Sequence, residues 1–464
     1  MKVVAKLAVV GPLLLGGCVS IPSDAGFSDV QNTASTRLGV EEVRWNRGEE
    51  DDKRVNAAIA RMLESPLTPS SAVQIALLNN RRMQAEYESL GIARAELLQA
   101  GLLENPSLSA EILIGNGAVS PSISLVQNFL NLLTLPARST IASSAFEAVK
   151  FEVSQKVLDL AADVRSTYYK LVADQQSVDF FRQVVSATEA GAELAFRQGQ
   201  AGNINRRDQA LQQSLYAQAI LELARAEARL ASDREMLSQL LGLSGDQTAW
   251  NLPDRLPDIP SAKPSIDGLE TLAIERRLDL AGARQELLTS TQALDLARQL
   301  RFLSVLGLGV KFEKDPENGK WLKGPVIELV LPIFDQGQAR IASLEAQQRR
   351  SEKLVVALAV DVRAQVREAW ARLVAAHDAA SYYQSTILPL QEQIIAESQR
   401  LATGMLISIY DVLRSKQDQI NAGREYIGAL KDYWTARADL ERAIAGPLPD
   451  AGASATQSSQ NPGS

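Results

Sequence analysis

The sequence predicts a mainly α-helical fold with a small membrane-embedded β part, arranged as two tandem copies of one unit. Three observations support this: a long internal repeat, heptads of apolar residues along very long helices, and two β-hairpins with one apolar face each. The chain has 464 residues, of which 46% are hydrophobic and 22% charged. This composition excludes a disordered chain and a bundle of membrane-spanning helices.

The internal repeat is visible in two long similar segments. Residues 163–173 resemble residues 365–375, and Gly199 pairs with Gly404 in the same order, about 200 residues apart in each case. Because the order of the matching segments is kept, the sequence predicts a tandem duplication.

The duplication divides the chain into segments. The first copy is assigned to residues 67–251 and the second to residues 266–445. Residues 252–265 link the copies and contain four prolines, so they cannot be helical. Residues 446–464 are small and polar, and we expect them to be disordered.

Each copy carries a long coiled-coil helical hairpin. Apolar residues recur every seven positions, which is typical of close-packed coiled coils. The series are Val157, Val164, Leu171, Val178 and Val185 in the first copy, and Val366, Leu373, Ala380, Ile387 and Ile394 in the second. A run of about 55 helical residues reaches about 80 Å, far beyond a compact domain. We expect the hairpins to reverse near Gly199 and Gly404, with glycine supplying a positive φ.

Two β-hairpins, at about residues 107–130 and 302–331, follow from alternating apolar and polar residues around turn sequences. One face of the second hairpin is expected to contact lipid, and its residues are Leu306, Leu308, Val310 and Phe312. Four strands cannot close a barrel, and open edges are not tolerated in lipid. Two chains would give an eight-stranded barrel filled by side chains, whereas three chains would give twelve strands around a water-filled lumen. The strand arithmetic therefore predicts a homotrimer in the lipid bilayer.

The N-terminus has the features of a bacterial lipoprotein signal. Residues 1–17 combine two lysines with an apolar stretch that is too short to span a bilayer. The stretch ends in Leu15-Gly16-Gly17-Cys18, which resembles a lipobox, and Cys18 is the only cysteine of the chain. We expect cleavage before Cys18 and its modification by acyl chains such as palmitate, which anchor the protein stably. Val19, in place of aspartate, fits sorting to the outer membrane.

Other functional classes find little support. The net charge of −7 disfavours binding to nucleic acid. No phosphate-binding loop or metal-ligand spacing is present, so the sequence indicates neither an enzyme nor a metal or cofactor beyond the lipid on Cys18. His377, the only histidine, is expected to be a packing or surface residue.

With these motifs in view, the chain from about Leu67 to Gly446 resembles the TolC-like outer-membrane efflux proteins, in particular their lipoprotein branch. The motifs are Asn105-Pro106-Ser107-Leu108 before the first strand and Leu331–Gly337 after the last, together with the Gly404 turn and the following residues 409–413. The resemblance implies a trimeric twelve-stranded barrel continued by an α-helical periplasmic tunnel. Residues 18–66 would run over the equatorial region of that tunnel.

The resemblance also implies a function and a place for the tip residues. The chain would be the exit duct of a tripartite system, conducting drugs or metals from an inner-membrane pump of the resistance-nodulation-division type and a periplasmic adaptor. The periplasmic tip, where adaptors dock, would include Gly199, Asn203, Gly404, Leu406, Ile407 and Asp411. Leu406 and Ile407 stand where some members carry aspartates, so one expectation is an apolar constriction that closes by dewetting. The alternative is that Leu406 packs as a knob between neighbouring helices.

Two alternatives remain open from the sequence. One is an outer-membrane conduit for type I protein secretion. The other is a periplasmic coiled-coil lipoprotein that acts as a tether and forms no pore. The paired strand hairpins of the duplication favour the efflux duct over the tether.

Overall fold

The computed structural model describes residues 24–115, 118–302 and 305–449. Cys18, the signal segment 1–17 and most of the tail lie outside the described residues. The chain divides into two compact units, and several long helices contribute residues to both. The described parts of unit 1 are residues 24–29, 87–151 and 281–355 without the gaps above, and unit 2 comprises residues 30–86, 152–280 and 356–449.

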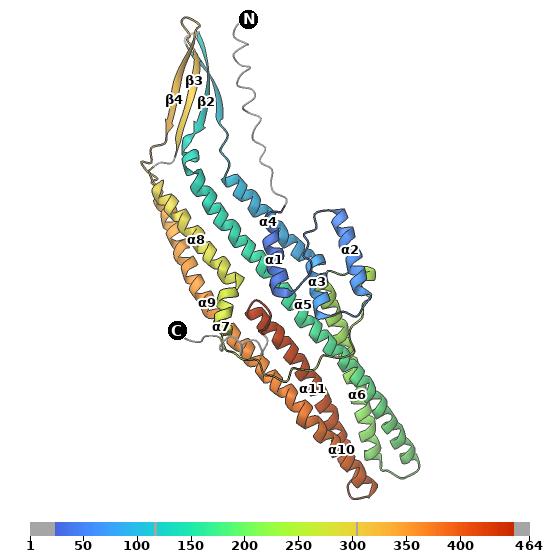
Figure 1. Ribbon diagram of the computed structural model, residues 1–464. Coiled ribbons are helices and arrows are strands. Elements are labelled where there is room, and N and C mark those ends of the chain that lie inside the picture. The colour runs from blue at the N-terminus through green and yellow to red at the C-terminus, as the bar shows by residue number, and fades with distance from the viewer. Residues whose placement is uncertain (1–23, 116–117, 303–304, 450–464) are drawn as a thin grey trace, which may run out of the picture. The chain divides into compact units, whose positions relative to one another are not determined.

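The elements repeat in the same order in the two copies (Figure 1). Two helices precede the first copy: α1 (Phe27–Leu38) and α2 (Glu49–Leu63). The first copy contains α3 (Pro69–Asn79), α4 (Arg81–Ala100), β1 (Ser107–Gly115), β2 (Ala118–Asn128), α5 (Phe129–Gln200), α6 (Arg206–Leu241) and the short 3-10 helix η3 (Gly245–Thr248). The second contains α7 (Leu269–Arg276), α8 (Leu278–Gln299), β3 (Leu306–Lys314), β4 (Trp321–Leu329), α9 (Gln338–Tyr382), the π-helix η4 (Tyr383–Ile387), α10 (Leu388–Thr403) and α11 (Ile409–Ala443).

The breaks between helices repeat with the elements. α3 ends at Asn80, whose φ and ψ are −62° and 113°, and α7 ends at Arg277, whose φ and ψ are −62° and 119°. Both residues therefore leave the helix in the same extended conformation before the next helix begins. α1 and α2 belong to residues 18–66, for which the sequence analysis predicted no helices.

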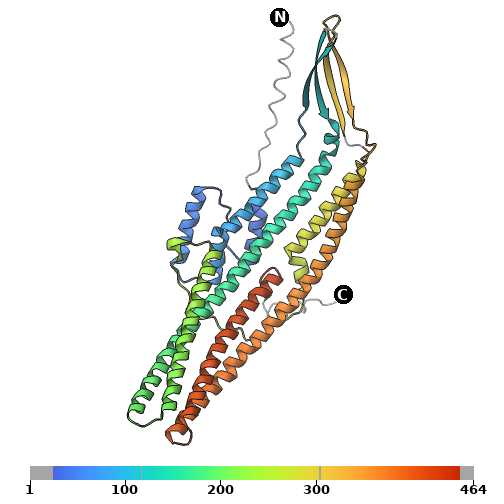
Figure 2. The same cartoon turned by 180° about the vertical axis from the view of Figure 1, so that it is seen from behind.

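Unit 1 contains the sheet and the helical segments that continue its strands (Figure 2). Polar contacts tie three of these segments together. Ser144 of α5 hydrogen-bonds to Gln292 of α8 at 3.0 Å, and Arg298 of α8 forms an ion pair with Glu345 of α9 at 2.8 Å. The N-terminal segment lies against α5, because a Cβ at Gly26 would lie 2.8 Å from the ring of Phe146.

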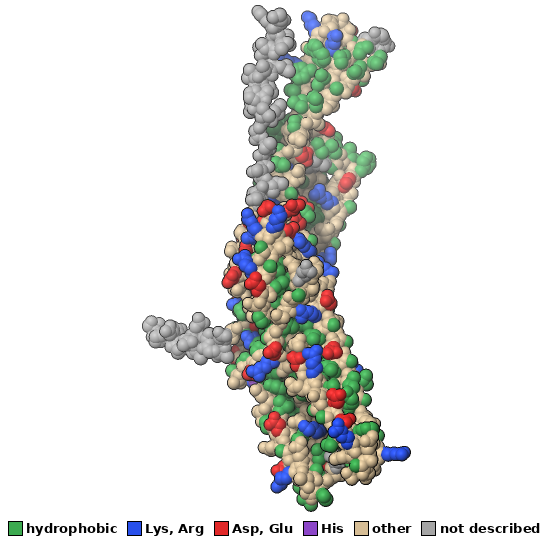
Figure 3. Space-filling view, turned by 90° about the vertical axis from the view of Figure 1, so that its right-hand side faces the viewer, with side chains coloured by type: hydrophobic (Ala, Val, Ile, Leu, Met, Phe, Trp, Pro, Cys, Tyr) green, Lys and Arg blue, Asp and Glu red, His purple; other side chains and the backbone are tan. Residues whose placement is uncertain are grey.

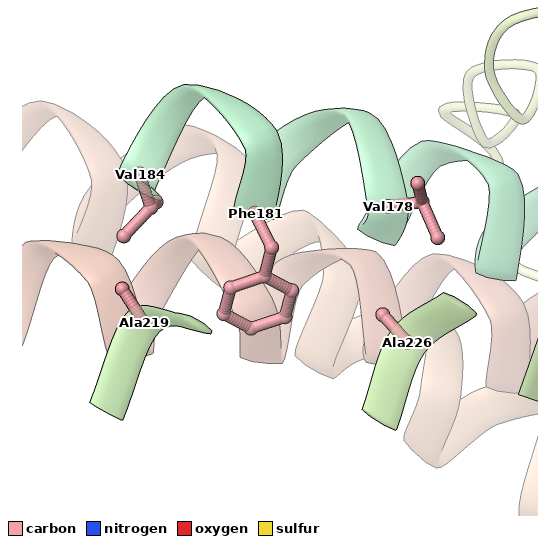
Figure 4. Packing of buried hydrophobic residues seen from close by; sticks show 5 residues of the cluster. All are labelled: Val178, Phe181, Val184, Ala219 and Ala226. Atoms are coloured by element: carbon pink, nitrogen blue, oxygen red, sulfur yellow. The ribbon is translucent and has the colours of Figure 1, made fainter. Parts of the chain in front are cut away.

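Unit 2 contains the paired ends of the long helices, and its packing follows the first heptad series. Four of the five predicted positions in α5 are fully buried, and Val185 is half-buried. Figure 4 shows Phe181 of α5 between Ala219 and Ala226 of α6, which are seven residues apart. Small residues at this spacing leave a hole for the phenylalanine knob, as in coiled coils.

The second heptad series is wrong beyond Ala380. Ile394, predicted to be buried, is 46% exposed, whereas the next residue, Ile395, is 7% exposed. The cause is η4, in which the N–H of Leu388 donates to the carbonyl of Tyr383 and one extra residue enters the turn. Pro389 follows at once and has no N–H for an ordinary helical bond. The buried face of α10 is therefore shifted by one position.

Within unit 2, three aromatic ring donors hold the proline-rich linker against α9 and α11. Trp434 donates to the carbonyl of Pro257 at 2.9 Å, His377 to that of Pro260 at 2.9 Å, and Trp370 to that of Pro264 at 3.0 Å. Because a carbonyl only accepts, the Nε2 of His377 must carry its proton. His377 is buried in this contact, so it is a packing residue.

Candidate functional site

The four strands form one antiparallel sheet in the order β1-β2-β3-β4, with two chemically different faces. Val310 pairs with Leu125 and Pro325, and Leu125 pairs with Leu108, so one row across the sheet is apolar. The neighbouring row, on the opposite face, contains Ser109, Ser124, Lys311 and Gly324. Since successive side chains of a strand point to opposite faces, one side of the sheet is apolar. The other side, called the polar face below, carries serines and charged residues together with a few apolar residues such as Val126 and Val326.

The apolar face is exposed within the single chain. Its large members include Leu108, Ile112, Ile123, Leu125, Leu308, Val310, Phe312 and Ile327, all of them exposed. Apolar side chains cover the sheet in the space-filling view (Figure 3). A patch of this size on a soluble protein marks an interaction surface, and an unbroken apolar row on alternate residues is typical of strands in lipid. The predicted lipid-facing residues Leu308, Val310 and Phe312 share this face, and Leu306 of the same row is half-buried.

The polar face is closely packed around two glycines. A Cβ on Gly309 would overlap the carbonyl oxygen of Leu125, and one on Gly307 would lie 3.0 Å from Val126. Gly324, on the same face, has open space around it. A hydrogen bond of 2.6 Å joins the hydroxyls of Ser109 and Ser124. The alternation of residues along β3 predicts which face of the sheet Gly309 lies on. It does not predict that this site has no room for a methyl group.

Both outer strands of the sheet have one free side. Among the described residues, β1 pairs only with β2, and β4 pairs only with β3. Unpaired backbone groups on an edge strand need a partner, most of all in lipid. A second copy of the chain, pairing its β4 with β1, satisfies this requirement.

Unit 2 places the residues predicted for the periplasmic tip at two helix reversals. Gly199 lies in the last turn of α5 and Asn203 in the α5–α6 turn, and Gly404, Leu406 and Ile407 lie in the α10–α11 turn. The turns approach each other through Arg207, whose guanidinium lies 4.7 Å from the centre of the Tyr410 ring. Leu406 is 74% exposed, Asn203 is exposed and Ile407 is half-buried.

The expected positive φ at Gly199 and Gly404 is wrong. Gly199 lies within α5, and Gly404 has φ −78°. The left-handed residues are Gly202, with φ +72°, and Met405, with φ +59°. In the first copy α5 continues one residue beyond Gly199, and in the second copy α10 ends just before Gly404. In both turns a later residue takes the left-handed conformation instead of the predicted glycine.

The same hydrogen-bond pattern closes both helices. The N–H groups of Gly202 and Asn203 donate to Gly199 and Gln198, at 3.1 and 2.9 Å. Met405 and Leu406 donate in the same way to Ala402 and Leu401, at 3.0 and 2.9 Å. These pairs are Schellman motifs, so Met405 is the structural equivalent of Gly202. The sequence pairing of Gly199 with Gly404 is displaced from this structural equivalence.

Asp411 has a structural role at the start of α11. Its carboxylate accepts the N–H of Ser408 at 3.1 Å and the Ser408 hydroxyl at 2.8 Å. This is a capping box, and a carboxylate in the first turn also interacts favourably with the helix dipole. In the first copy Asn205 accepts the N–H of Asp208 at 2.9 Å, at the same place in the turn.

Unit 2 also contains a carboxyl group with a raised pKa, that of Asp174. Burial of Asp174 on α5, together with a hydrogen bond and repulsion from Asp233 on α6, raises the pKa of Asp174 to about 6. The positive charges of Arg229 on α6 and Lys431 on α11 oppose this rise in pKa. The sequence analysis did not single out Asp174, because two acids in different helices give no local pattern.

Two features of the described residues bear on other functions. In residues 24–115, 118–302 and 305–449, no group of three or more histidine, cysteine, aspartate or glutamate side chains is placed to hold a metal ion. Among the helices described there, none is long and apolar enough to cross a membrane.

Comparison with known proteins supports the family resemblance. No protein-family profile matches the chain. The cobalt-zinc-cadmium resistance protein CzcC of Cupriavidus metallidurans is 26% identical over 396 residues, which cover 83% of this chain and 91% of that protein.

Solved structures share the fold. The CmeC outer membrane channel of Campylobacter jejuni has a TM-score of 0.67 at 14% identity, covering 89% of this chain and 90% of that one. The open state of the MtrE outer membrane channel of Neisseria gonorrhoeae has a TM-score of 0.66 at 16% identity, covering 81% and 88%. The predicted resemblance to the TolC-like outer-membrane efflux proteins, and the predicted fold class, are confirmed.

Proposed function

We propose that this chain, a TolC-like outer-membrane efflux protein, is one protomer of a trimeric exit duct in a tripartite efflux system. It resides in the outer membrane and passively conducts solutes that an inner-membrane pump and a periplasmic adaptor deliver. The helical parts extend into the periplasm. The chain performs no chemistry on its cargo.

The single observation that carries this proposal is the two-faced sheet with two free edges. Its apolar face suits lipid and its serine-rich face suits water, which is the arrangement of a membrane barrel wall. Four strands per chain with unpaired β1 and β4 edges require neighbouring copies to close the wall. A coiled-coil tether without a pore has no use for this sheet.

The tip turns are the proposed docking surface for the adaptor and the proposed constriction. Leu406 and Met405 are exposed at the α10–α11 turn, and Asn203 at the α5–α6 turn. The carboxylate of Asp411 is engaged by Ser408 in the capping box, so we do not assign the constriction to this acid. We assign it to Leu406 and Ile407, which form an apolar ring in the trimer. Such a ring excludes water when it narrows, and so closes the duct by dewetting.

The N-terminal anchor belongs to the same proposal. Acylation of Cys18 fixes the chain in the outer membrane, and the segment after it continues to Gly26, which lies against α5. Intact-mass measurement of the purified protein should show an N-terminus at Cys18 carrying diacylglycerol and a further acyl chain. An unmodified Cys18 would show that the chain has no N-terminal lipid anchor.

The cargo class is drugs or divalent metals. CzcC is described as a cobalt-zinc-cadmium resistance protein. A passive duct selects little by itself, so the pump decides which solute enters. Deleting the gene should raise the intracellular content of the pump's substrates, and comparing zinc, cobalt and a cationic dye identifies the class.

Photo-crosslinking tests the partner assignment. A benzoylphenylalanine at Asn203 or Leu406 in the full chain should crosslink in cells to one periplasmic protein, the adaptor. The same probe at Ile327, on the apolar face of β4, should not capture it. Crosslinks to secreted protein alone would favour type I secretion, and no crosslink at either turn would place the docking surface elsewhere.

A further inference from the structure

The apolar face of the sheet ends in a cluster of lysines beside the β3–β4 turn. In the described strands, the rows on this face contain two charged residues, Lys314 and Lys323. Both lie next to the turn, and Lys320 precedes β4 in the turn itself. All three side chains are exposed, and basic side chains are visible at this end of the sheet (Figure 3).

The register brings these lysines together with two aromatic rings. Lys314 pairs with Trp321, and Lys323 pairs with Phe312. Lys314 and Lys323 are thus diagonal neighbours on one face, with Cα atoms about 7–8 Å apart. Trp321 and Phe312 are exposed. Aromatic rings beside lysines are typical of the level where strands leave the hydrocarbon and meet lipid headgroups.

The charges of the cluster are not neutralised by the sheet. The described ion pair of this hairpin joins Lys311 and Glu313, on the polar face, at 3.3 Å. The acids of the turn are Asp315 and Glu317, and Asp315 accepts the N–H of Glu317 at 2.9 Å. Lys320 lies in the same turn, and among the described residues no ion pair joins either acid to Lys314, Lys320 or Lys323. The equivalent end of the β1–β2 hairpin carries only apolar residues, such as Ile114 and Val119, on this face.

A lysine on a lipid-facing row is costly at the bilayer midplane and tolerated near the interface. Two such lysines at the turn end, with a third beside them, therefore mark the headgroup level and attract anionic groups there. Because the opposite strand ends continue into the periplasmic helices of the proposed duct, the turn end faces the outer leaflet. The anionic headgroup of that leaflet is the phosphorylated lipid A of lipopolysaccharide.

We propose that Lys314, Lys320 and Lys323, flanked by Phe312 and Trp321, bind the phosphates of one lipid A molecule on each protomer. This inference rests on the proposed function, since it requires the sheet to lie in the outer membrane. The site orients the barrel and seals its wall against the outer leaflet. The polar-face residue Lys311 takes no part.

Native mass spectrometry of the full-length trimer titrated with diphosphorylated lipid A tests the site. The wild type should bind up to three molecules per trimer. Each lysine near an anionic lipid surface contributes about fivefold in affinity, so Lys314→Gln, Lys320→Gln and Lys323→Gln together should weaken binding about a hundredfold. Lys311→Gln is the matched control and should leave binding unchanged, and the triple change to arginine should preserve it.

Titrations with other lipids identify the ligand. Monophosphorylated lipid A should bind more weakly than the diphosphorylated form, and phosphatidylglycerol more weakly still. Equal binding by the wild type and the triple glutamine variant, an equal loss in Lys311→Gln, or equal affinity for phosphatidylglycerol would overturn the proposal. Displacement of lipid A by millimolar inorganic phosphate would show a site for soluble anions instead.

Two controls keep the outcomes separate. The same spectra report the trimer, and if the triple variant does not assemble, Lys323→Gln alone should show a loss of about fivefold. Each variant is also recorded in planar bilayers. A pore without preference for lipid A contradicts this inference alone, whereas the absence of a pore contradicts the proposed function.

Discussion

The two copies of the repeat close their helices in the same way but with different residues. In the first copy the left-handed position after α5 is Gly202, and the one after α6 is Gly242. In the second copy the corresponding positions after α10 and α11 are Met405 and Ala445, with φ +59° and +53°. The first copy thus uses glycine at both ends, and the second uses residues that strain the backbone.

The long helices of the two copies also differ, and the irregular geometry is again in the second copy. α5 is a single helix from Phe129 to Gln200, whereas its counterpart is interrupted at η4 before Pro389. Strained backbone and π-turns are concentrated at functional and moving segments of proteins. The two copies therefore share the hydrogen-bond pattern at their helix ends, while the second copy has left-handed non-glycine residues and a π-turn that the first copy does not show in its described helices.

The two β-hairpins also differ on the polar face, where Gly307 and Gly309 of β3 pair with Asn128 and Val126 of β2. A change of Val310 to arginine, in the middle of the apolar face, should cost about 2–4 kcal/mol per protomer in assembly. Gly324→Arg is the control, since it lies on the polar face with open space. Outer-membrane trimer yield measures both, and equal loss would mean that the apolar face does not contact lipid. Gly309 cannot serve as this control because its site excludes any side chain.

At the base of the first hairpin, Gly242→Ala should destabilise unit 2 by about 3 kcal/mol. The new Cβ would lie 2.5 Å from the carbonyl oxygen of Asn79, in addition to the left-handed strain. Gly202→Ala has the same backbone conformation and nothing within 4 Å, so it should cost only about 1 kcal/mol. Thermal unfolding monitored by circular dichroism compares the two. Similar midpoints would show that Asn79 moves away freely.

The carboxyl pair formed by Asp174 and Asp233 in the first copy predicts a pH effect on stability. The folded-state pKa of Asp174 is about 6, above that of an unfolded aspartate, so the folded chain holds the extra proton between pH 4 and 6. Stability should therefore fall by about 2 kcal/mol as pH rises through this window. Asp174→Asn should raise the unfolding midpoint at pH 7.5 and leave it unchanged at pH 4. A variant that is less stable at pH 7.5 would contradict the assignment.

The smallest expected effect is at the tip. Met405→Gly should stabilise the second hairpin by about 1 kcal/mol, because glycine adopts the left-handed conformation without strain. Gly202→Met should destabilise the first hairpin by a similar amount. Hydrogen exchange of α10 and α6 reports each end separately. Loss of protection in Met405→Gly would show that the Met405 side chain makes a stabilising contact in the trimer.

The sequence predicts the parts of the fold that depend on periodicity. The period of two assigned Leu308, Val310 and Phe312 to one face, and the period of seven located the buried positions of α5. The period of seven does not predict the buried positions after Ala380, because a π-turn inserts one residue there. This turn depends on the missing N–H of Pro389 and on local packing, which the period does not report. The helices α1 and α2 were missed because short amphipathic segments outside the repeat give weak patterns.

The glycines predicted where the helices reverse, but not the backbone geometry of the two turns. Either neighbour of a turn can take the left-handed conformation, and Met405 does so against its intrinsic preference. The exclusion of side chains at Gly309 depends on the distance between β2 and β3, which no sequence pattern reports. The contact of Asp174 with Asp233 likewise depends on the distance between two segments that are far apart in the sequence.

The claim that the apolar face meets lipid and the polar face lines a pore is tested most directly by thiol labelling during single-channel recording. Ile123 and Ser124 are adjacent in β2 and point to opposite faces. A charged, water-soluble thiol reagent should lower the conductance of Ser124→Cys trimers and leave Ile123→Cys and the wild type unchanged. Block of Ile123→Cys but not of Ser124→Cys, or no conductance in the wild type, would contradict the account.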